Sequence, residues 1–348
     1  MDELRLAVVG ATGAVGRELL LLLNRIELLN AQVVPAATAA SAGVDLRAEL
    51  GLTLPVESVR AIGDVDFGEL DAVFFTAGAE VSRQHAEKAA AVGCLVIDNS
   101  SAFRAREDVP LVVPQVNPCL LAERPASGLI SNPNCSTIQL VRVLHPLCEL
   151  ASLERVILTT YQAASGGGRR GLDELAESSA SVLADGQPPS GRFGPPLAFN
   201  LVPQIGMVDE RAVSNEEHKL ATEPLKIMDL PDLKVSATAV RVPIFHCHAE
   251  AAWVRFDRPV SATDAAEVLR STRGILLYTD ADSPPYPTPR LVERSGLGRA
   301  WVHVGRVRVD PADPTALWLW IVADNLWVGA ALNAVNILQT VLKYGWLA

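Results

Sequence analysis

A cysteine stands directly before an apolar stretch that is typical of a helix. Asn132-Pro-Asn134-Cys135-Ser136-Thr137 precedes residues 138–147. At a helix N-terminus, free N–H groups and the positive end of the dipole lower the pKa of a thiol and stabilise its thiolate. Cys135 is therefore a candidate nucleophile. Cys94 and Cys148 lie inside apolar runs, where a free cysteine acts as a small buried hydrophobic residue.

A thiolate needs an acid/base partner, and the segment Arg241-Val-Pro-Ile-Phe-His246-Cys247-His248 offers two histidines. Because they are two positions apart, they would face the same side of a strand. Arg241 and His248 are seven positions apart and would lie on opposite faces unless a bulge or turn intervenes. Pro243 permits such an irregularity. Each histidine is thus a candidate acid/base group or a structural residue.

A glycine turn follows the apolar residues 4–9 and precedes the leucine-rich residues 17–24. A strand, a glycine turn and a helix in this order predict the start of a dinucleotide-binding unit. The first glycine permits a tight turn, the second allows close approach of a pyrophosphate, and the third allows helix–strand packing. The expected cofactor-binding residues in this turn are Gly10, Thr12, Gly13, Ala14, Val15 and Gly16.

The segment after the second expected strand bears on which cofactor binds. An NAD site usually places a carboxylate there for the ribose hydroxyls. Residues 36–43 contain no carboxylate and no arginine, but the hydroxyl residues Thr38 and Ser41 could hold a 2′-phosphate. The sequence therefore favours NADP and leaves NAD open.

The remaining pattern predicts an α/β protein followed by an α+β domain. In the first half, strands at 31–36, 72–76 and 94–97 alternate with a helix at 82–92, which indicates a parallel, doubly wound sheet. In the second half, longer strands indicate a mostly antiparallel sheet. These strands are expected at 155–161, 234–242, 250–256, 302–309 and 316–323, with loops at 187–196 and 280–289 and a closing helix at 330–344.

Composition narrows the class of protein. The 348 residues have a net charge of −10 and are 49% hydrophobic, which indicates about two globular domains and argues against a nucleic-acid partner. No apolar run is long enough to predict a membrane helix, and the N-terminal residues do not resemble a signal peptide. Five cysteines without a CxxC pair indicate reduced thiols in the cytoplasm rather than disulfides or a zinc site.

Several motifs in order give the chain a family resemblance. They are the glycine turn at 10–16, Asn99-Ser-Ser-Ala-Phe-Arg104, the Cys135 motif, Tyr161-Gln-Ala-Ala-Ser-Gly166, Arg241 to His248, and Ala323-Asp-Asn-Leu-Trp-Val-Gly-Ala-Ala-Leu-Asn333. Together they resemble the aspartate-β-semialdehyde dehydrogenases over nearly the whole chain. The resemblance implies NADPH-dependent reduction of β-aspartyl phosphate to aspartate semialdehyde, which feeds lysine (by the diaminopimelate route), threonine and methionine biosynthesis.

The resemblance also implies an architecture. It implies a Rossmann-like NADP-binding domain over residues 1–133, completed by the C-terminal residues 325–348. Residues 134–324 would form a catalytic and dimerisation domain with a mostly antiparallel sheet. It further implies a small-molecule substrate and a homodimer or homotetramer, with no nucleic-acid or membrane partner and no metal.

Roles follow from the resemblance, residue by residue. Cys135 resembles the nucleophile, His248 the acid/base and Gln162 the residue that orients the intermediate. Arg241 resembles the ligand of the substrate carboxylate, for which a guanidinium fork is suited. The other implied substrate contacts are Glu216 for the amino group and Lys219, Arg104 and Asn134 for phosphate, and further cofactor contacts are Ser165, Gly166 and Asn325. By themselves, Glu216, Lys219 and Arg104 would be expected on a solvated surface.

Five positions depart from the family's usual pattern. Ala40 replaces a common arginine, which weakens the preference for NADP over NAD. Cys247 and Ala249 flank His248 where glycine and serine are common, and Cys247 suggests sensitivity to oxidation. Gln115 and Trp327 replace a common glutamate and a common basic residue.

Two alternatives remain at this stage. An N-acetyl-γ-glutamyl-phosphate reductase shares the chemistry, but its acetylated substrate needs no acidic partner such as Glu216. A non-catalytic paralogue is disfavoured by the presence of Cys135, Gln162, Arg241 and His248. Glyceraldehyde-3-phosphate dehydrogenases are disfavoured because their Ser-Cys-Thr-Thr-Asn setting is absent.

Overall fold

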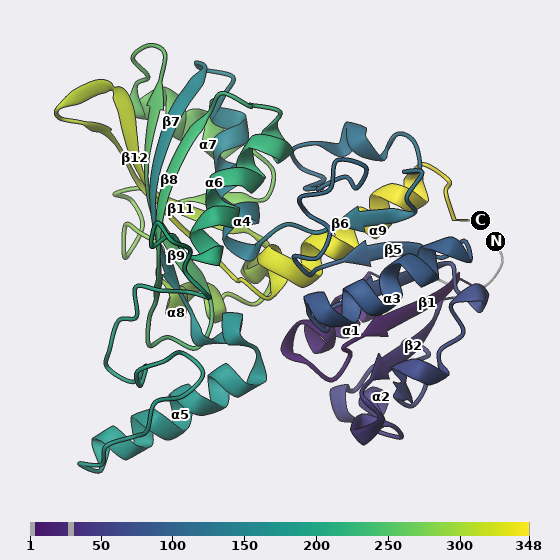
Figure 1. Ribbon diagram of the computed structural model, residues 1–348. Coiled ribbons are helices and arrows are strands. Elements are labelled where there is room, and N and C mark those ends of the chain that lie inside the picture. The colour runs from purple at the N-terminus through teal and green to yellow at the C-terminus, as the bar shows by residue number, and fades with distance from the viewer. Residues whose placement is uncertain (1–3, 27–30, 348) are drawn as a thin grey trace. The chain divides into compact units, whose positions relative to one another are not determined.

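The computed structural model describes residues 4–26 and 31–347, which divide into two compact units. The first comprises residues 4–134 and 330–347, and the second comprises residues 135–329. Each unit has its own six-stranded sheet (Figure 1). The C-terminal helix thus belongs to the same unit as the N-terminal segment.

The first unit is a parallel sheet of order β3-β2-β1-β4-β5-β6. Its strands are β1 Leu4–Val9, β2 Ala31–Ala37, β3 Arg60–Ala61, β4 Ala72–Phe75, β5 Leu95–Asp98 and β6 Leu129–Ser131, and its helices are α1 Ala14–Arg25, α2 Leu46–Leu50, α3 Ala79–Ala91 and α9 Leu332–Lys343. The strand order reverses between β1 and β4, which is where doubly wound sheets bind ligands.

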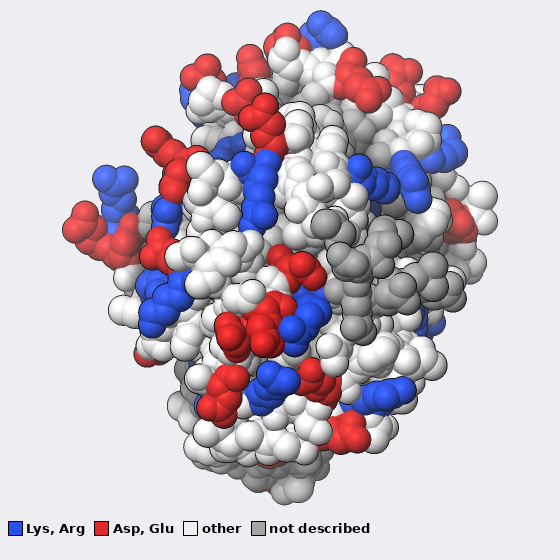
Figure 2. All heavy atoms as spheres, turned by 90° about the vertical axis from the view of Figure 1, so that its right-hand side faces the viewer, with Lys and Arg blue, Asp and Glu red and all other residues white. Residues whose placement is uncertain are grey.

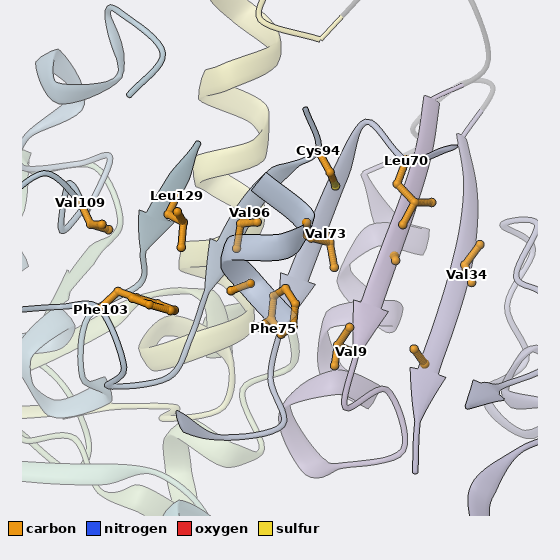
Figure 3. Close-up of a cluster of buried hydrophobic side chains, with 14 residues drawn as sticks. Val9, Val34, Leu70, Val73, Phe75, Cys94, Val96, Phe103, Val109 and Leu129 are labelled. Carbon is orange, nitrogen blue, oxygen red and sulfur yellow. The ribbon is translucent and has the colours of Figure 1, made fainter. Parts of the chain in front are cut away.

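Alternating strand residues build the core of this unit. Val9, Val34, Val73, Phe75 and Val96 belong to one buried cluster on the sheet, which also includes Ala86 and Ala89 of α3 (Figure 3). All five side chains are almost wholly withdrawn from solvent. The core fixes the ends of β1 and β2, and with them the glycine turn.

The second unit is a mixed sheet of order β10-β11-β12-β9-β7-β8. Its strands are β7 Leu153–Gln162, β8 Lys234–Arg241, β9 His248–Phe256, β10 Ile275–Leu277, β11 Val302–Asp310 and β12 Asp313–Ala323, and its helices are α4 Cys135–Leu147, α5 Arg169–Leu183, α6 Asn215–Met228, α7 Ala262–Ser271 and α8 Pro289–Glu293. Three of the five strand pairings are antiparallel, and the pairs β7–β8 and β10–β11 are parallel. The parallel pairs arise because α6 and α8 fall within the connections that lead back to the sheet.

Helices α4, α6 and α7 pack on one face of this sheet, as Figure 1 shows. The opposite face presents Ile157, which is 41% exposed, and the half-buried Trp253 and Trp318. A sheet face of this kind is suited to contact with another protein surface.

Candidate active site

Cys135 is the first residue of α4, as the sequence predicts. The helix is almost wholly buried beyond it, while Cys135 itself is partly exposed. A Cβ atom on Gly329 would lie 2.6 Å from the Cβ of Cys135, so only glycine leaves room for the thiol-bearing residue. Cys135 therefore combines a helix N-terminus with access from outside, which a nucleophile requires.

The other cysteines of this unit have less favourable surroundings for a thiolate. Burial raises the pKa of Cys148 to about 11, and it raises the pKa of the wholly buried Cys247 even further. In the first unit, burial also raises the pKa of Cys94 to about 12. Because oxidation proceeds through the thiolate, the structure disfavours the oxidation sensitivity suggested for Cys247.

Gln162 connects the start of α4 to α6. Its Nε2 donates to Ser136 Oγ at 3.0 Å, to Glu216 Oε1 at 3.0 Å and, more weakly, to Thr160 Oγ1 at 3.3 Å. Only 1% of Gln162 is exposed. These bonds fix the orientation of the amide beside the residue that follows Cys135.

Glu216 is buried, contrary to the expectation from its charged local sequence. Helix α6 begins at a capping box formed by Ser214 and Glu217, and this turns Glu216 inward. Its Oε2 accepts a bond from Lys219 Nζ at 2.7 Å. The sequence could not show this burial, because the partner Gln162 lies 54 positions away.

Arg241 and His248 meet although they stand at the ends of two different strands. Residues 242–247 form a turn between β8 and β9, which is the interruption that the sequence left open. A Cβ atom on Gly166 would lie 2.6 Å from Arg241 Nη1 and 3.4 Å from His248 Nε2. Gly166 thus lets both side chains approach one stretch of backbone. His246 belongs to the turn and not to a strand that it would share with His248.

The hydrogen bonds of His248 define its neutral form. The backbone N–H of Ala163 donates to Nδ1 at 3.0 Å, so Nε2 carries the proton of the neutral ring. Burial, and secondarily the charge of Arg241, lowers the pKa of His248 to about 3. Nε2 has no hydrogen-bond partner among the described residues. His248 is therefore a neutral donor near Arg241.

Asn325 is hydrogen-bonded both to Ser165, another predicted cofactor contact, and to the turn 242–247 that precedes His248. Its Oδ1 accepts bonds from Ser165 Oγ at 3.0 Å and from the backbone N–H of Cys247 at 3.1 Å. Cys247 has a φ of +70°, a left-handed conformation that favours glycine. This geometry fits the glycine that the family resemblance places before the histidine, because glycine adopts it without strain.

Arg104 and Asn134 belong to the first unit, and both are largely buried. Arg104 Nε donates to the carbonyl of Asn132 at 2.9 Å, and its Nη2 donates to the carbonyl of Asn99 at 2.8 Å. Asn134 directly precedes Cys135 in the chain. The expectation that Arg104 lies on a solvated surface is wrong, because these carbonyls hold it in place.

The glycine turn has the shape expected of a phosphate cradle. Gly10 has a φ of +87°, and a Cβ atom there would lie 2.7 Å from Thr76 Oγ1. A Cβ atom on Gly16 would collide with the carbonyl of Gly10. Gly13 is the N-cap of α1, and no side chain of the described residues caps this helix, so its first N–H groups remain available to a ligand. This cradle fits a pyrophosphate.

The region after β2 holds Thr38 and Ser41 in and beside a short 3₁₀ turn, Ala39–Ser41. Thr38 is exposed and Ser41 is half-buried. The nearby cation Arg17 already pairs with Glu49 at 2.8 Å and donates to the carbonyl of Thr12. Arg60, on the strand β3 that contacts this turn, also pairs with an acidic side chain, Glu57, at 2.5 Å.

The other two departures have clear structural settings. Gln115 is exposed in a turn, and Trp327 is buried. The guanidinium of Arg299 lies over the Trp327 ring at 4.3 Å and donates to Asp324 Oδ2 at 2.6 Å. Arg299 therefore places a positive charge beside Trp327, although it comes from a different part of the sequence.

Three features of the described residues bear on the expected partners. No group of three or more His, Cys, Asp or Glu could hold a metal ion. No helix is long and apolar enough to cross a membrane. On the face drawn in Figure 2, lysines and arginines are interspersed with acidic side chains.

The parallel sheet with its glycine cradle is typical of an oxidoreductase that binds a nicotinamide dinucleotide, and the second unit adds a cysteine at a helix N-terminus. Two family models match the chain: "Semialdehyde dehydrogenase, NAD binding domain" over residues 5–124 and "Semialdehyde dehydrogenase, dimerisation domain" over residues 144–328.

Individual relatives specify the family further. The chain is 40% identical to the aspartate-semialdehyde dehydrogenase of Campylobacter jejuni, with 97% of each chain covered. The structure of aspartate semialdehyde dehydrogenase II from Vibrio cholerae, complexed with ASA, has a TM-score of 0.92 and 38% identity over 99% of each chain. The Candida albicans enzyme with NADP has a TM-score of 0.75 and 27% identity, covering 99% of this chain and 100% of that one. The chain belongs to the aspartate-semialdehyde dehydrogenase family.

Proposed function

We propose that the chain reduces β-aspartyl phosphate to L-aspartate 4-semialdehyde with NADPH, through a thioester on Cys135, in lysine, threonine and methionine biosynthesis. The observation that carries this proposal is the placement of Cys135 at the start of α4, beside a buried polar network that contains Gln162 and Glu216. The Vibrio cholerae relative complexed with ASA supports the choice of substrate.

Each charged group of the substrate is bound by a side chain of opposite charge. Arg241 binds the α-carboxylate, and Glu216 binds the amino group, because each presents a charged and largely buried side chain. Lys219, Arg104 and Asn134 bind the phosphate. An N-acetylated substrate lacks the ammonium group, so the buried Glu216 argues against N-acetyl-γ-glutamyl phosphate.

The chemistry then proceeds in two stages. Cys135 Sγ bonds to the substrate carbonyl carbon while the carbon–oxygen bond to phosphate breaks, and phosphate leaves. When bound, the nicotinamide cofactor would supply the hydride that reduces the resulting thioester. His248 Nε2–H donates to the oxygen that becomes negative, and Gln162 orients the intermediate. Cys135 leaves as a thiolate when the aldehyde forms.

The cofactor contacts are assigned to the cradle and to the second unit. The pyrophosphate is held at Gly10, Thr12, Gly13, Ala14, Val15 and Gly16, with Thr38 and Ser41 beside the 2′-phosphate and Ser165, Gly166 and Asn325 as further contacts. The relative bound to NADP supports NADP as the cofactor. NAD remains the second candidate because Ala40 removes a cation.

We also propose that the protein works as a homodimer or homotetramer in the cytoplasm. The dimerisation-domain match supports self-association, and the open sheet face with Ile157, Trp253 and Trp318 is the proposed contact. Light scattering of the wild type and of Ile157→Lys tests this contact, because a charge at its centre would lower the observed mass.

An assay of phosphate-dependent oxidation of L-aspartate semialdehyde tests the reaction. NADP and NAD are compared, N-acetylglutamate semialdehyde is the rival substrate, and Cys119→Ala is the control for Cys135→Ala. We expect Cys135→Ala to lose at least about a thousandfold in kcat and Cys119→Ala to retain activity. Turnover of only the acetylated substrate would reassign the chain to the N-acetyl-γ-glutamyl-phosphate reductases. No activity on either substrate would favour a non-catalytic paralogue.

A further inference from the structure

A cavity of about 630 Å³ lies beside Arg241 in the second unit. Its wall includes Gly166, Arg192, Phe193 and Gln204. Arg192 and Phe193 come from the Gly/Pro/Ser-rich segment 187–196, to which the proposed reaction assigns no role. This segment therefore forms part of the surroundings of the carboxylate-binding arginine.

Phe193 covers one side of the Arg241 guanidinium. The ring centroid lies 5.4 Å from Arg241 Cζ, within the range of a cation–π interaction. On its other contacts, Arg241 Nη1 donates to the carbonyl of Ala163 at 2.7 Å and lies close to Gly166. The guanidinium is thus held between an aromatic ring and backbone, which limits its rotation.

The position of Phe193 is itself determined by packing. It contacts a small buried cluster that includes Ala164, Leu175 and Val202. A Cβ atom on Gly167 would lie 3.0 Å from the ring, and one on Gly171 would lie 2.8 Å from it. Two glycines therefore make room for this aromatic side chain, which indicates a defined position rather than a chance surface contact.

Arg192 supplies a second positive charge to the same cavity. Its backbone N–H donates to Glu174 Oε2 at 2.7 Å, which anchors the loop. Its guanidinium forms no ion pair with any residue that the structure describes. Its charge repels that of Arg241: burial is the main cause that lowers the pKa of Arg241, Glu216 and Cys135 raise this pKa, and Arg192 lowers it further. A bound carboxylate would relieve this repulsion between like charges.

We propose that Arg192 and Phe193 complete the carboxylate-recognition site: Phe193 positions the Arg241 guanidinium, and Arg192 attracts the substrate carboxylate into the cavity. This inference rests on the proposed function, because Arg241 is assigned there as the carboxylate ligand. It adds a positioning residue and a specificity-determining residue from a loop that the reaction itself does not use.

Alkylation of Cys135 tests the proposal without turnover. Iodoacetate carries a carboxylate and iodoacetamide does not, so the ratio of their rates reports attraction of carboxylates toward the thiol. Peptide mass spectrometry measures the rate at Cys135, and the exposed Cys119 in the same sample is the reference. We expect Arg192→Ala to lower the iodoacetate rate at Cys135 about tenfold at low salt and to leave the iodoacetamide rate nearly unchanged.

The matched controls are Arg211→Ala, which removes an exposed arginine outside the cavity lining, and Phe199→Ala, which removes an exposed phenylalanine. Phe193→Ala is expected to lower the iodoacetate preference, and Phe193→Tyr to restore it because the ring remains. Unchanged ratios in both Arg192→Ala and Phe193→Ala would overturn the proposal. If Phe193→Ala does not fold, Phe193→Leu, which retains an apolar side chain, replaces it.

Steady-state kinetics provide the second measurement. For aspartate semialdehyde, we expect Arg192→Ala and Phe193→Ala to raise KM about tenfold and to change kcat much less, because both act on binding. A loss in kcat alone would contradict a role in carboxylate recognition. If the wild type did not turn over aspartate semialdehyde but kept its iodoacetate preference, the proposed reaction would fail while the carboxylate site would stand.

Discussion

The side chain of Asn325 accepts a hydrogen bond from the backbone of Cys247 at 3.1 Å and holds that residue in a left-handed conformation. The next residue is His248, whose Nδ1 accepts from Ala163. The backbone conformation at position 247 therefore determines the position of the His248 side chain. Asn325, two residues after the end of β12, stabilises this conformation.

At position 247, glycine should stabilise the folded protein more than alanine does, which is the reverse of their usual order. Alanine normally stabilises a position relative to glycine, but a left-handed conformation costs a residue with a Cβ atom about 1–2 kcal/mol. We expect Cys247→Gly to be about 1 kcal/mol more stable than Cys247→Ala, as measured by urea unfolding. A more stable alanine variant would show that Asn325 does not hold this conformation in solution.

His248 should act as a neutral donor throughout the working pH range. Its pKa is lowered to about 3, so the ring stays neutral from pH 5 to 8 and its ionisation should not change kcat in that range. We expect kcat against pH to lack a step near the ordinary histidine value, and His248→Ala to reduce kcat about 10²- to 10⁴-fold. A step near pH 6.5 that disappears in His248→Ala would contradict the structure.

Glu250 should make the folded protein less stable as pH rises. It is wholly buried on β9, and neither carboxyl oxygen has a hydrogen-bond partner among the described residues. Burial raises its pKa well above the ordinary value, and the nearby amide of Gln139 opposes this to a smaller extent.

A group with a raised folded-state pKa contributes its full stability below the unfolded pKa and loses it as pH rises. We therefore expect Glu250→Gln to gain stability relative to the wild type from pH 5 to 8, by up to about 1.4 kcal/mol per pH unit. Urea unfolding at each pH measures the difference, with the exposed Glu210→Gln as control. A difference that does not depend on pH would show that Glu250 keeps the same protonation in both states.

Restoring a cation at position 40 should strengthen the preference for NADP. A hydrogen-bonded arginine–phosphate contact contributes about 1.5–3 kcal/mol, which corresponds to roughly 10- to 150-fold in affinity. We expect Ala40→Arg to raise the NADP-to-NAD ratio of kcat/KM by at least about tenfold, and Ala42→Arg to change it less. An equal change in both variants would indicate general electrostatic attraction rather than contact at residue 40.

Local patterns in the sequence determine much of this protein. The glycine turn after β1, the alternation of strands and helices in the first unit, and the position of Cys135 at the start of α4 all depend on neighbouring residues. Backbone conformation and hydrophobic periodicity are local properties, so the sequence alone predicts them. The parallel edges of the second sheet are less evident, because strand pairing joins distant segments.

Only the tertiary structure decides the surroundings of the site residues. It buries Glu216 against Gln162, brings Phe193 onto Arg241, and places Arg241 and His248 at Gly166. It also gives Cys247 its left-handed conformation and leaves Glu250 without a partner in the described chain. These features depend on burial and on contacts between segments far apart in the chain, and such contacts form only when the whole unit packs.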